Sequence, residues 1–275
     1  MAKAIFGNHG FACAPFRLCI ALATVVLTTS LGLEARAAGT GAVKNIVLVH
    51  GTHEDGSAWR GVYDVLKSHG YHVSVVQQPL TGLSDDVAAT LRVIDQQDGP
   101  VILVGHSYGG TIITVAGTDP KVRALVYVAA MQPDVGESTN QLVASIPGQV
   151  SNRDVKLTKD GFIFIDPNKF AAEVGTDLPP ARAEYMANSQ MPVAAAAFNA
   201  PVTVAAWHDK PSYGIVATKD RVLSPMLARR MYKRSGAKIT EIKANHLVEV
   251  SQPRAVASVI EGAARSAGER QSSGH

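Results

Sequence analysis

Short, uninterrupted apolar runs alternate with amphipathic segments along most of this chain. Four runs, at residues 45–50, 100–104, 124–129 and 212–218, are rich in β-branched residues and have the length of strands buried on both faces. Two further strand segments, at 71–77 and 238–242, mix apolar and polar residues. Between them, apolar residues recur at helical spacing over 59–69, 83–95, 110–116, 226–235 and 253–267. This alternation predicts an α/β fold built on a mainly parallel sheet flanked by helices.

The alternation stops between residues 131 and 207. This stretch is rich in Pro, Gly, Ala and Asn, with helix signals only at 167–174 and 179–188. It is too long for a plain connection, so we interpret it as a helical cap inserted over an active site. The α/β core would then comprise residues 38–130 and 208–267, followed by a disordered tail at 268–275.

A separate apolar segment precedes the core. Two basic residues stand before an uncharged run at 18–33, and Ala35-Arg36-Ala37 forms a small-residue cleavage site. This pattern predicts a secretory signal peptide over residues 1–37 and a mature chain that begins at Ala38. We therefore expect a periplasmic or secreted protein with no membrane attachment after cleavage. An uncleaved anchor is the alternative, although the run is short for a span.

Composition narrows the class of protein further. The chain has 275 residues, of which 46% are hydrophobic, enough for one sizeable core. Its formal net charge is +3 without a long basic run, so we expect no nucleic-acid partner. Both cysteines, Cys13 and Cys19, lie in the predicted leader, which leaves the mature chain without a disulfide or a cysteine nucleophile. Because no His, Asp or Glu residues show metal-ligand spacing, we expect no metal and no cofactor.

One motif carries the clearest chemistry. Gly105-His106-Ser107-Tyr108-Gly109 follows an apolar strand and precedes a helical segment, which is the context of a nucleophile elbow. The alternative is a glycine-rich turn with an idle serine. A serine hydroxyl is a poor nucleophile by itself, so it needs a histidine base and an acid that orients the base. On such a sheet the chain order should be serine, acid, histidine.

The two partners are expected after later strands, because catalytic groups gather at the carboxyl ends of parallel strands. His246 directly follows the last strand and is the candidate base. Asp220 follows the strand before it and is the candidate acid, with Asp134 as the open alternative. His106 lies beside the nucleophile in sequence, so its side chain should point elsewhere. His50, at the end of the first strand, is interpreted as a supporting hydrogen-bonding residue.

Acyl transfer also needs N–H donors for the oxyanion that forms on the carbonyl oxygen. We expect one donor to be the backbone N–H of Tyr108, directly after the nucleophile. The other should be the backbone N–H of Thr52, where Gly51 lets the loop approach closely. A phosphate-binding loop is excluded, because the chain contains no G-x-x-x-x-G-K-[ST] motif.

Several motifs together resemble the α/β-hydrolase superfamily: His50-Gly51-Thr52, Gly56-Ser57-Ala58-Trp59, Gly105 to Gly110, Asp220 and Asn245-His246. Within it they resemble a branch of small bacterial esterase-like hydrolases related to plant methyl-ester esterases and hydroxynitrile lyases. The resemblance covers nearly the whole mature chain. It implies a serine nucleophile, a helical cap and no cofactor. It also supports Ser107, Asp220 and His246 as the triad, with Thr52 and Tyr108 as oxyanion donors.

The predicted function is a serine hydrolase that acts on a small, largely apolar carboxylic ester through an acyl-enzyme. Alternatives are a lyase or perhydrolase that uses the same triad, or a small-ligand receptor without catalysis. In the related lyases a lysine follows the catalytic histidine, and a threonine stands where this chain has Gly51. Here Leu247 follows His246. These two differences favour ester hydrolysis over cyanohydrin cleavage.

Overall fold

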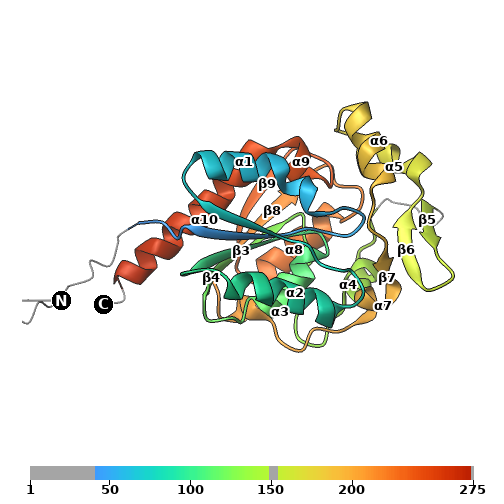
Figure 1. The fold of residues 1–275 in the computed structure, drawn as a ribbon. Coiled ribbons are helices and arrows are strands. Elements are labelled where there is room, and N and C mark those ends of the chain that lie inside the picture. Colours follow the sequence, from blue (N-terminus) through green and yellow to red (C-terminus); the bar gives the residue numbers. More distant parts are fainter. Residues whose placement is uncertain (1–40, 149–153, 274–275) are drawn as a thin grey trace, which may run out of the picture. The chain divides into compact units, whose positions relative to one another are not determined.

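A six-stranded parallel sheet forms the centre of the protein, in a computed structural model that describes residues 41–148 and 154–273 (Figure 1). The strand order is β2-β1-β3-β4-β8-β9, and each neighbouring pair is parallel. The bounds are β1 Asn45–Val49, β2 His72–Val76, β3 Val101–His106, β4 Val122–Val128, β8 Ser212–Ala217 and β9 Lys238–Ile242. The four central strands are almost wholly buried and the two edge strands are partly exposed, as their sequence patterns predict.

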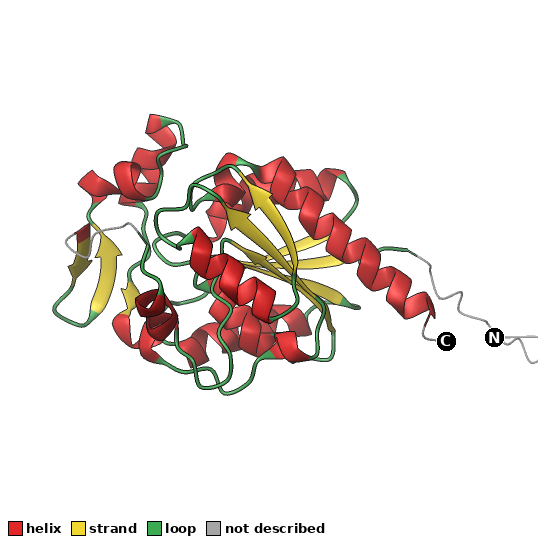
Figure 2. Cartoon of the chain, turned by 180° about the vertical axis from the view of Figure 1, so that it is seen from behind, coloured by secondary structure: helices red, strands yellow, loops and turns green. Residues whose placement is uncertain are grey.

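Helices cover both faces of this sheet (Figures 1 and 2). They are α1 Arg60–Ser68, α2 Leu83–Asp95, α3 Gly109–Ala116, α8 Pro225–Arg234, α9 Val248–Ser251 and α10 Pro253–Ser273. Alternate strand residues enter two hydrophobic clusters, since successive strand side chains point to opposite faces. Val47 and Val49 of β1 pack with α2, α3 and α8, whereas Ile46 and Leu48 pack with α1 and α10. The predicted fold class is therefore confirmed.

The segment between β4 and β8 forms a cap of mixed structure. Its elements are α4 Thr139–Ser145, β5 Val155–Leu157, β6 Phe162–Ile165, α5 Pro167–Glu173, α6 Pro180–Asn188, β7 Val193–Ala194, α7 Ala195–Asn199 and a 3-10 turn at Ala206–His208. Two of these helices match the predicted ones. A cap made of helices alone was the expectation, and the antiparallel sheet β5-β6-β7 corrects it. Its strands are too short to show a period, although the turn at Asp160-Gly161 is a typical hairpin signal.

The last helix is longer than its sequence pattern predicts. α10 continues to Ser273, so the predicted disordered tail is wrong for residues 268–273. Gly268 packs directly against the chain that enters β1, where an added Cβ would lie 2.2 Å from the Gly41 carbonyl oxygen. The Val43 N–H also donates a 3.0 Å hydrogen bond to the Ala264 carbonyl. This contact with a distant segment supports the helix where local sequence signals are weak.

Two predictions fall outside the described residues, namely the leader at 1–37 and the last two residues of the tail. Of the helices that the structure describes, none is both long enough and apolar enough to span a membrane.

Candidate active site

Ser107 lies on a sharp turn between β3 and α3, as the elbow motif predicts. Its φ angle is +51°, a left-handed conformation that is costly for a residue with a side chain. Two nearby glycines, Gly105 and Gly110, are required by close backbone contacts. A Cβ on Gly105 would lie 2.5 Å from the Gly109 carbonyl oxygen, and one on Gly110 would lie 2.1 Å from that of Met131. Only glycines permit this turn, which places the serine hydroxyl at the start of α3.

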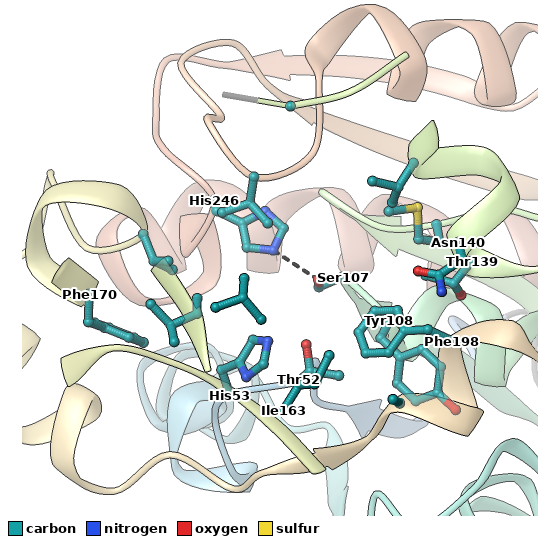
Figure 3. Close-up of a pocket in the computed structure, with 18 of the residues that line it drawn as sticks. Thr52, His53, Ser107, Tyr108, Thr139, Asn140, Ile163, Phe170, Phe198 and His246 are labelled. Carbon is teal, nitrogen blue, oxygen red and sulfur yellow. Dashed lines mark hydrogen bonds between the residues drawn. The ribbon is translucent and has the colours of Figure 1, made fainter. Parts of the chain in front are cut away.

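The three predicted triad residues meet in space. His246 Nε2 lies 2.9 Å from Ser107 Oγ (Figure 3), and His246 Nδ1 lies 2.8 Å from Asp220 Oδ2. This arrangement fits a neutral imidazole that donates from Nδ1 to the carboxylate and accepts the serine proton at Nε2. The other carboxylate oxygen of Asp220 accepts hydrogen bonds from the backbone N–H groups of Val222 and Leu223, at 2.8 and 2.9 Å. All three triad side chains are buried.

Asp134, the alternative acid, has a different partner. Its carboxylate lies 2.8 Å from His208 Nε2 at the edge of the cap, where the His208 side chain is exposed and that of Asp134 is partly exposed. The sequence leaves undecided which of the two aspartates, Asp134 or Asp220, orients the candidate base. The geometry places Asp220, and not Asp134, against His246.

Both residues that carry the predicted oxyanion donors lie beside the nucleophile. Thr52 and Tyr108 both line the cavity in front of Ser107 (Figure 3). Neither backbone N–H donates a hydrogen bond to any other residue in the described part of the chain. Gly51 permits the close approach of this loop, because an added Cβ would lie 2.8 Å from Ser107 Cβ. Two free N–H donors beside a serine hydroxyl suit a developing oxyanion.

The cavity over the triad has a volume of about 410 Å³. Its walls come mainly from the cap, and their apolar side chains include Val143, Leu157, Ile163, Ile165, Phe170, Val174 and Phe198. Its polar side chains include Thr139, Asn140, Lys156 and His53. A cavity of this size and character suits a small, mostly apolar molecule.

A buried charged cluster lies directly behind the triad. His106 points away from the cavity, as expected, and its Nδ1 donates to Glu54 Oε1 at 2.6 Å. The same carboxylate oxygen accepts the Gly51 N–H at 2.5 Å. His106 Nε2 donates to the backbone carbonyl of His246 at 3.1 Å and lies 3.3 Å from Glu249 Oε2. One imidazole thus joins the oxyanion loop to the loop of the candidate base.

The charges of this cluster follow from its burial and contacts. Burial alone favours a neutral imidazole, but the negative charges of Glu249, which is ionised above its own pKa, and of Glu54 outweigh burial and raise the pKa of His106 to about 10. Burial also raises the pKa of Glu249 to about 8, and neither of its oxygens has a hydrogen-bond partner among the described residues. For Glu54, the charge and hydrogen bond of His106 overcome burial and lower the pKa. At neutral pH, we therefore assign Glu54 as a carboxylate, His106 as an imidazolium and Glu249 as a carboxylic acid.

Sequence reasoning missed both glutamates of this cluster. One ligand atom from each of Glu54, His106 and Glu249 lies within 4.8 Å of the others, yet their positions show no metal-ligand spacing. Both nitrogens of His106 already donate hydrogen bonds, so the cluster is a hydrogen-bonded ion pair with a neighbouring acid. The available signal was a glutamate in an otherwise apolar segment, Val248-Glu249-Val250. His50, expected to support the site, contacts the Gly51 carbonyl through Nδ1 at 2.7 Å.

Comparison with known proteins agrees with this fold. The chain matches the model of the alpha/beta hydrolase family over residues 46–259, and it belongs to that family. It is 32% identical over 146 residues to a probable hydrolase of Phoma sp., covering 52% of this chain and 58% of that protein. It is 36% identical over 122 residues to a carbendazim hydrolyzing esterase of Nocardioides sp., covering 39% and 50%. These matches span about half the length of those relatives.

Solved structures show the same fold at lower identity. A pyrethroid hydrolase of Sphingobium faniae superposes with a TM-score of 0.69 at 21% identity, covering 81% of this chain and 97% of that one. Tomato methylketone synthase I, in complex with 2-tridecanone, gives a TM-score of 0.71 at 18% identity, covering 82% and 98%. The esterases among the curated relatives agree with the resemblance found in the sequence.

Proposed function

We propose that this protein is a serine carboxylic-ester hydrolase that works through an acyl-enzyme. The observation that carries the proposal is the continuous hydrogen-bonded chain from Ser107 through His246 to Asp220 on the wall of an apolar cavity. A serine with a base and an acid that orients the base is the minimal machinery for nucleophilic acyl transfer.

The positions of the site residues support each step of ester hydrolysis, from acylation of Ser107 to deacylation. His246 Nε2 takes the proton of Ser107 Oγ as the oxygen attacks the ester carbonyl. The N–H groups of Thr52 and Tyr108 donate to the oxyanion, and Asp220 stabilises the imidazolium. The imidazolium then protonates the leaving alkoxide, which releases the alcohol. A water molecule, deprotonated by the same imidazole, attacks the acyl-enzyme and frees the carboxylic acid.

The cavity supports a small, largely apolar ester as the substrate class. Its volume of about 410 Å³ admits a molecule of about drug-fragment size, and its cap side is mainly aliphatic and aromatic. The relatives whose names mention esterase activity are consistent with this class.

We also propose that the protein is exported, on the basis of the leader pattern and the small-residue site at Ala35-Arg36-Ala37. N-terminal sequencing of the protein from periplasm and from medium tests this. An N-terminus at Ala38 supports export with cleavage, whereas an intact Met1 on membrane-bound protein contradicts it.

The central test uses the mature protein with p-nitrophenyl esters of increasing acyl length. Ser107→Ala should abolish turnover without unfolding the protein, and loss of a triad nucleophile reduces kcat by about 10⁶-fold in one studied enzyme. An organophosphonate should label Ser107 in the wild type. Wild-type turnover by Ser107→Ala, or labelling of a different serine, would refute the proposal.

A further inference from the structure

His53 occupies an unusual position beside the candidate nucleophile. It directly follows Thr52 and lines the same cavity as Ser107 and His246, as Figure 3 shows. Its φ angle is +63°, so a residue with a large side chain is held in the left-handed region. Such strain costs about 1–3 kcal/mol and persists where the surroundings impose it, often at functional sites.

The two ring nitrogens of His53 lie in different environments. Nδ1 is fully buried and has no hydrogen-bond partner in the described part of the chain. Nε2 also forms no hydrogen bond in that part of the chain, but it is not fully buried. It is therefore the ring nitrogen that a ligand in the cavity can reach. A buried N–H without an acceptor is rarer in proteins than a lone pair without a donor. The tautomer with its proton on Nε2 is therefore favoured, and the ring presents a donor.

The ring is also neutral at ordinary pH. Burial is the main cause that lowers the pKa of His53 to about 4, and it outweighs the negative charge of Glu54, which acts to raise that pKa. A base this weak does not compete with His246 for the serine proton. The neutral ring of His53 can instead donate a hydrogen bond from Nε2 to an acceptor in the cavity.

We propose that His53 is a specificity-determining residue that donates a hydrogen bond to an acceptor oxygen of the substrate near the scissile ester. The inference rests on the proposed function. It names the substrate class more narrowly, as small apolar esters that carry a keto or ether oxygen within a few bonds of the ester group. A donor already desolvated in an apolar cavity disfavours analogues that leave it unpaired.

The test compares ethyl 3-oxobutanoate with ethyl butanoate, two esters of equal chain length that differ in one acceptor oxygen. Three variants are matched to the question. His53→Leu removes the donor, and His53→Gln keeps an N–H donor on a side chain that suffers the same backbone strain. His53→Gly removes the donor and relieves the positive φ. All rates are normalised to sites titrated with an organophosphonate, so unfolded protein does not enter the comparison.

The kcat/KM ratio of keto ester to plain ester should fall about fivefold to tenfold in His53→Leu and His53→Gly. His53→Gln should retain most of the wild-type ratio. The loss should appear mainly in KM, because the hydrogen bond is present before and during acyl transfer. If His53→Leu does not fold, His53→Gly provides the same comparison.

Equal ratios in wild type, His53→Leu and His53→Gly would overturn the inference, as would a ratio in His53→Gln that falls with theirs. Failure of the proposed function gives a different result. In that case the wild type would hydrolyse neither ethyl ester nor any p-nitrophenyl ester. Ester turnover with an unchanged ratio would therefore reject the role of His53 alone.

Discussion

Glu54 and Glu249 both contact the buried imidazole of His106, and all three side chains are at most 1% exposed. Changing each glutamate to glutamine should alter the free energy of unfolding in opposite directions. Our assignment makes Glu54 charged and Glu249 protonated at neutral pH. Changing either to glutamine preserves shape and removes the ability to carry a negative charge. The pair therefore forms a matched experiment on where the buried charge lies.

At pH 7, Glu54→Gln should cost about 3–5 kcal/mol of unfolding free energy, because it leaves the imidazolium without its buried counter-charge. The lower end of that range is expected, because the substituted amide can still accept the Gly51 N–H and His106 can release its proton. At pH 7, Glu249→Gln should not lower the unfolding free energy and should raise it, because the wild type must take up a proton at Glu249 on folding whereas the amide does not. A typical total stability of about 5–15 kcal/mol makes the difference readily measurable.

The two variants should also differ in their pH dependence. Folding raises the pKa of Glu249 from 4.5 to about 8, so the folded protein holds a proton that the unfolded chain releases. The wild type therefore loses stability as pH rises through that window, and Glu249→Gln should gain relative to it there. The pKa of Glu54 is lowered instead, so its contribution is present above 4.5 and lost on acidification. The penalty of Glu54→Gln should shrink at acid pH.

Urea unfolding between pH 4 and pH 9 measures these effects, and tryptophan fluorescence follows them. The buried Trp59 ring lies edge-on to His106 with centroids 6.5 Å apart, so it reports on this part of the core. Equal costs for the two variants at pH 7 would refute the charge assignment. A Glu249→Gln difference that does not change with pH would refute the raised pKa of Glu249.

Three further predictions concern the reaction. Asp220→Asn should reduce kcat by several orders of magnitude, as in a comparable triad where the change costs about 10⁴-fold, whereas Asp134→Asn should leave ester turnover nearly unchanged; steady-state kinetics would contradict the triad if the order were reversed. Gly51→Ala should impair acylation and slow phosphonate labelling, because the added Cβ would lie 2.8 Å from Ser107 Cβ; wild-type labelling kinetics would contradict the close approach. Mandelonitrile should not be cleaved, since Leu247 lines the cavity where a lysine would be needed to stabilise cyanide; fast cyanide release with negligible ester turnover would reverse the esterase proposal.

The sequence by itself determined the central sheet and the nucleophile turn. Strands such as β1 and β3 are buried on both faces, so their runs are continuously apolar and visible without any partner strand. The elbow around Ser107 is equally local, because the clashes that require Gly105 and Gly110 arise within a few residues or at the adjoining strand ends. Parallel topology then places the candidate base, His246, near the serine, since strand ends of one direction meet at one edge.

Contacts between distant segments decided the remainder. The choice of Asp220 over Asp134 depends on which loop reaches His246. The cap strands β5, β6 and β7 are too short to carry a pattern and exist because they pair with one another. α10 extends beyond the residues with apolar helical spacing because its C-terminal part packs on the segment before β1.

The buried cluster shows the same division most clearly. Glu54, His106 and Glu249 come from three segments that lie far apart in the chain, and each is an ordinary polar residue where it stands in the sequence. The charge of each group depends on the other two only because the fold removes all three side chains from water. A desolvated carboxylate is stable only beside a counter-charge. The sequence supplied the chemical groups of this site, and the tertiary structure determined which of them are charged.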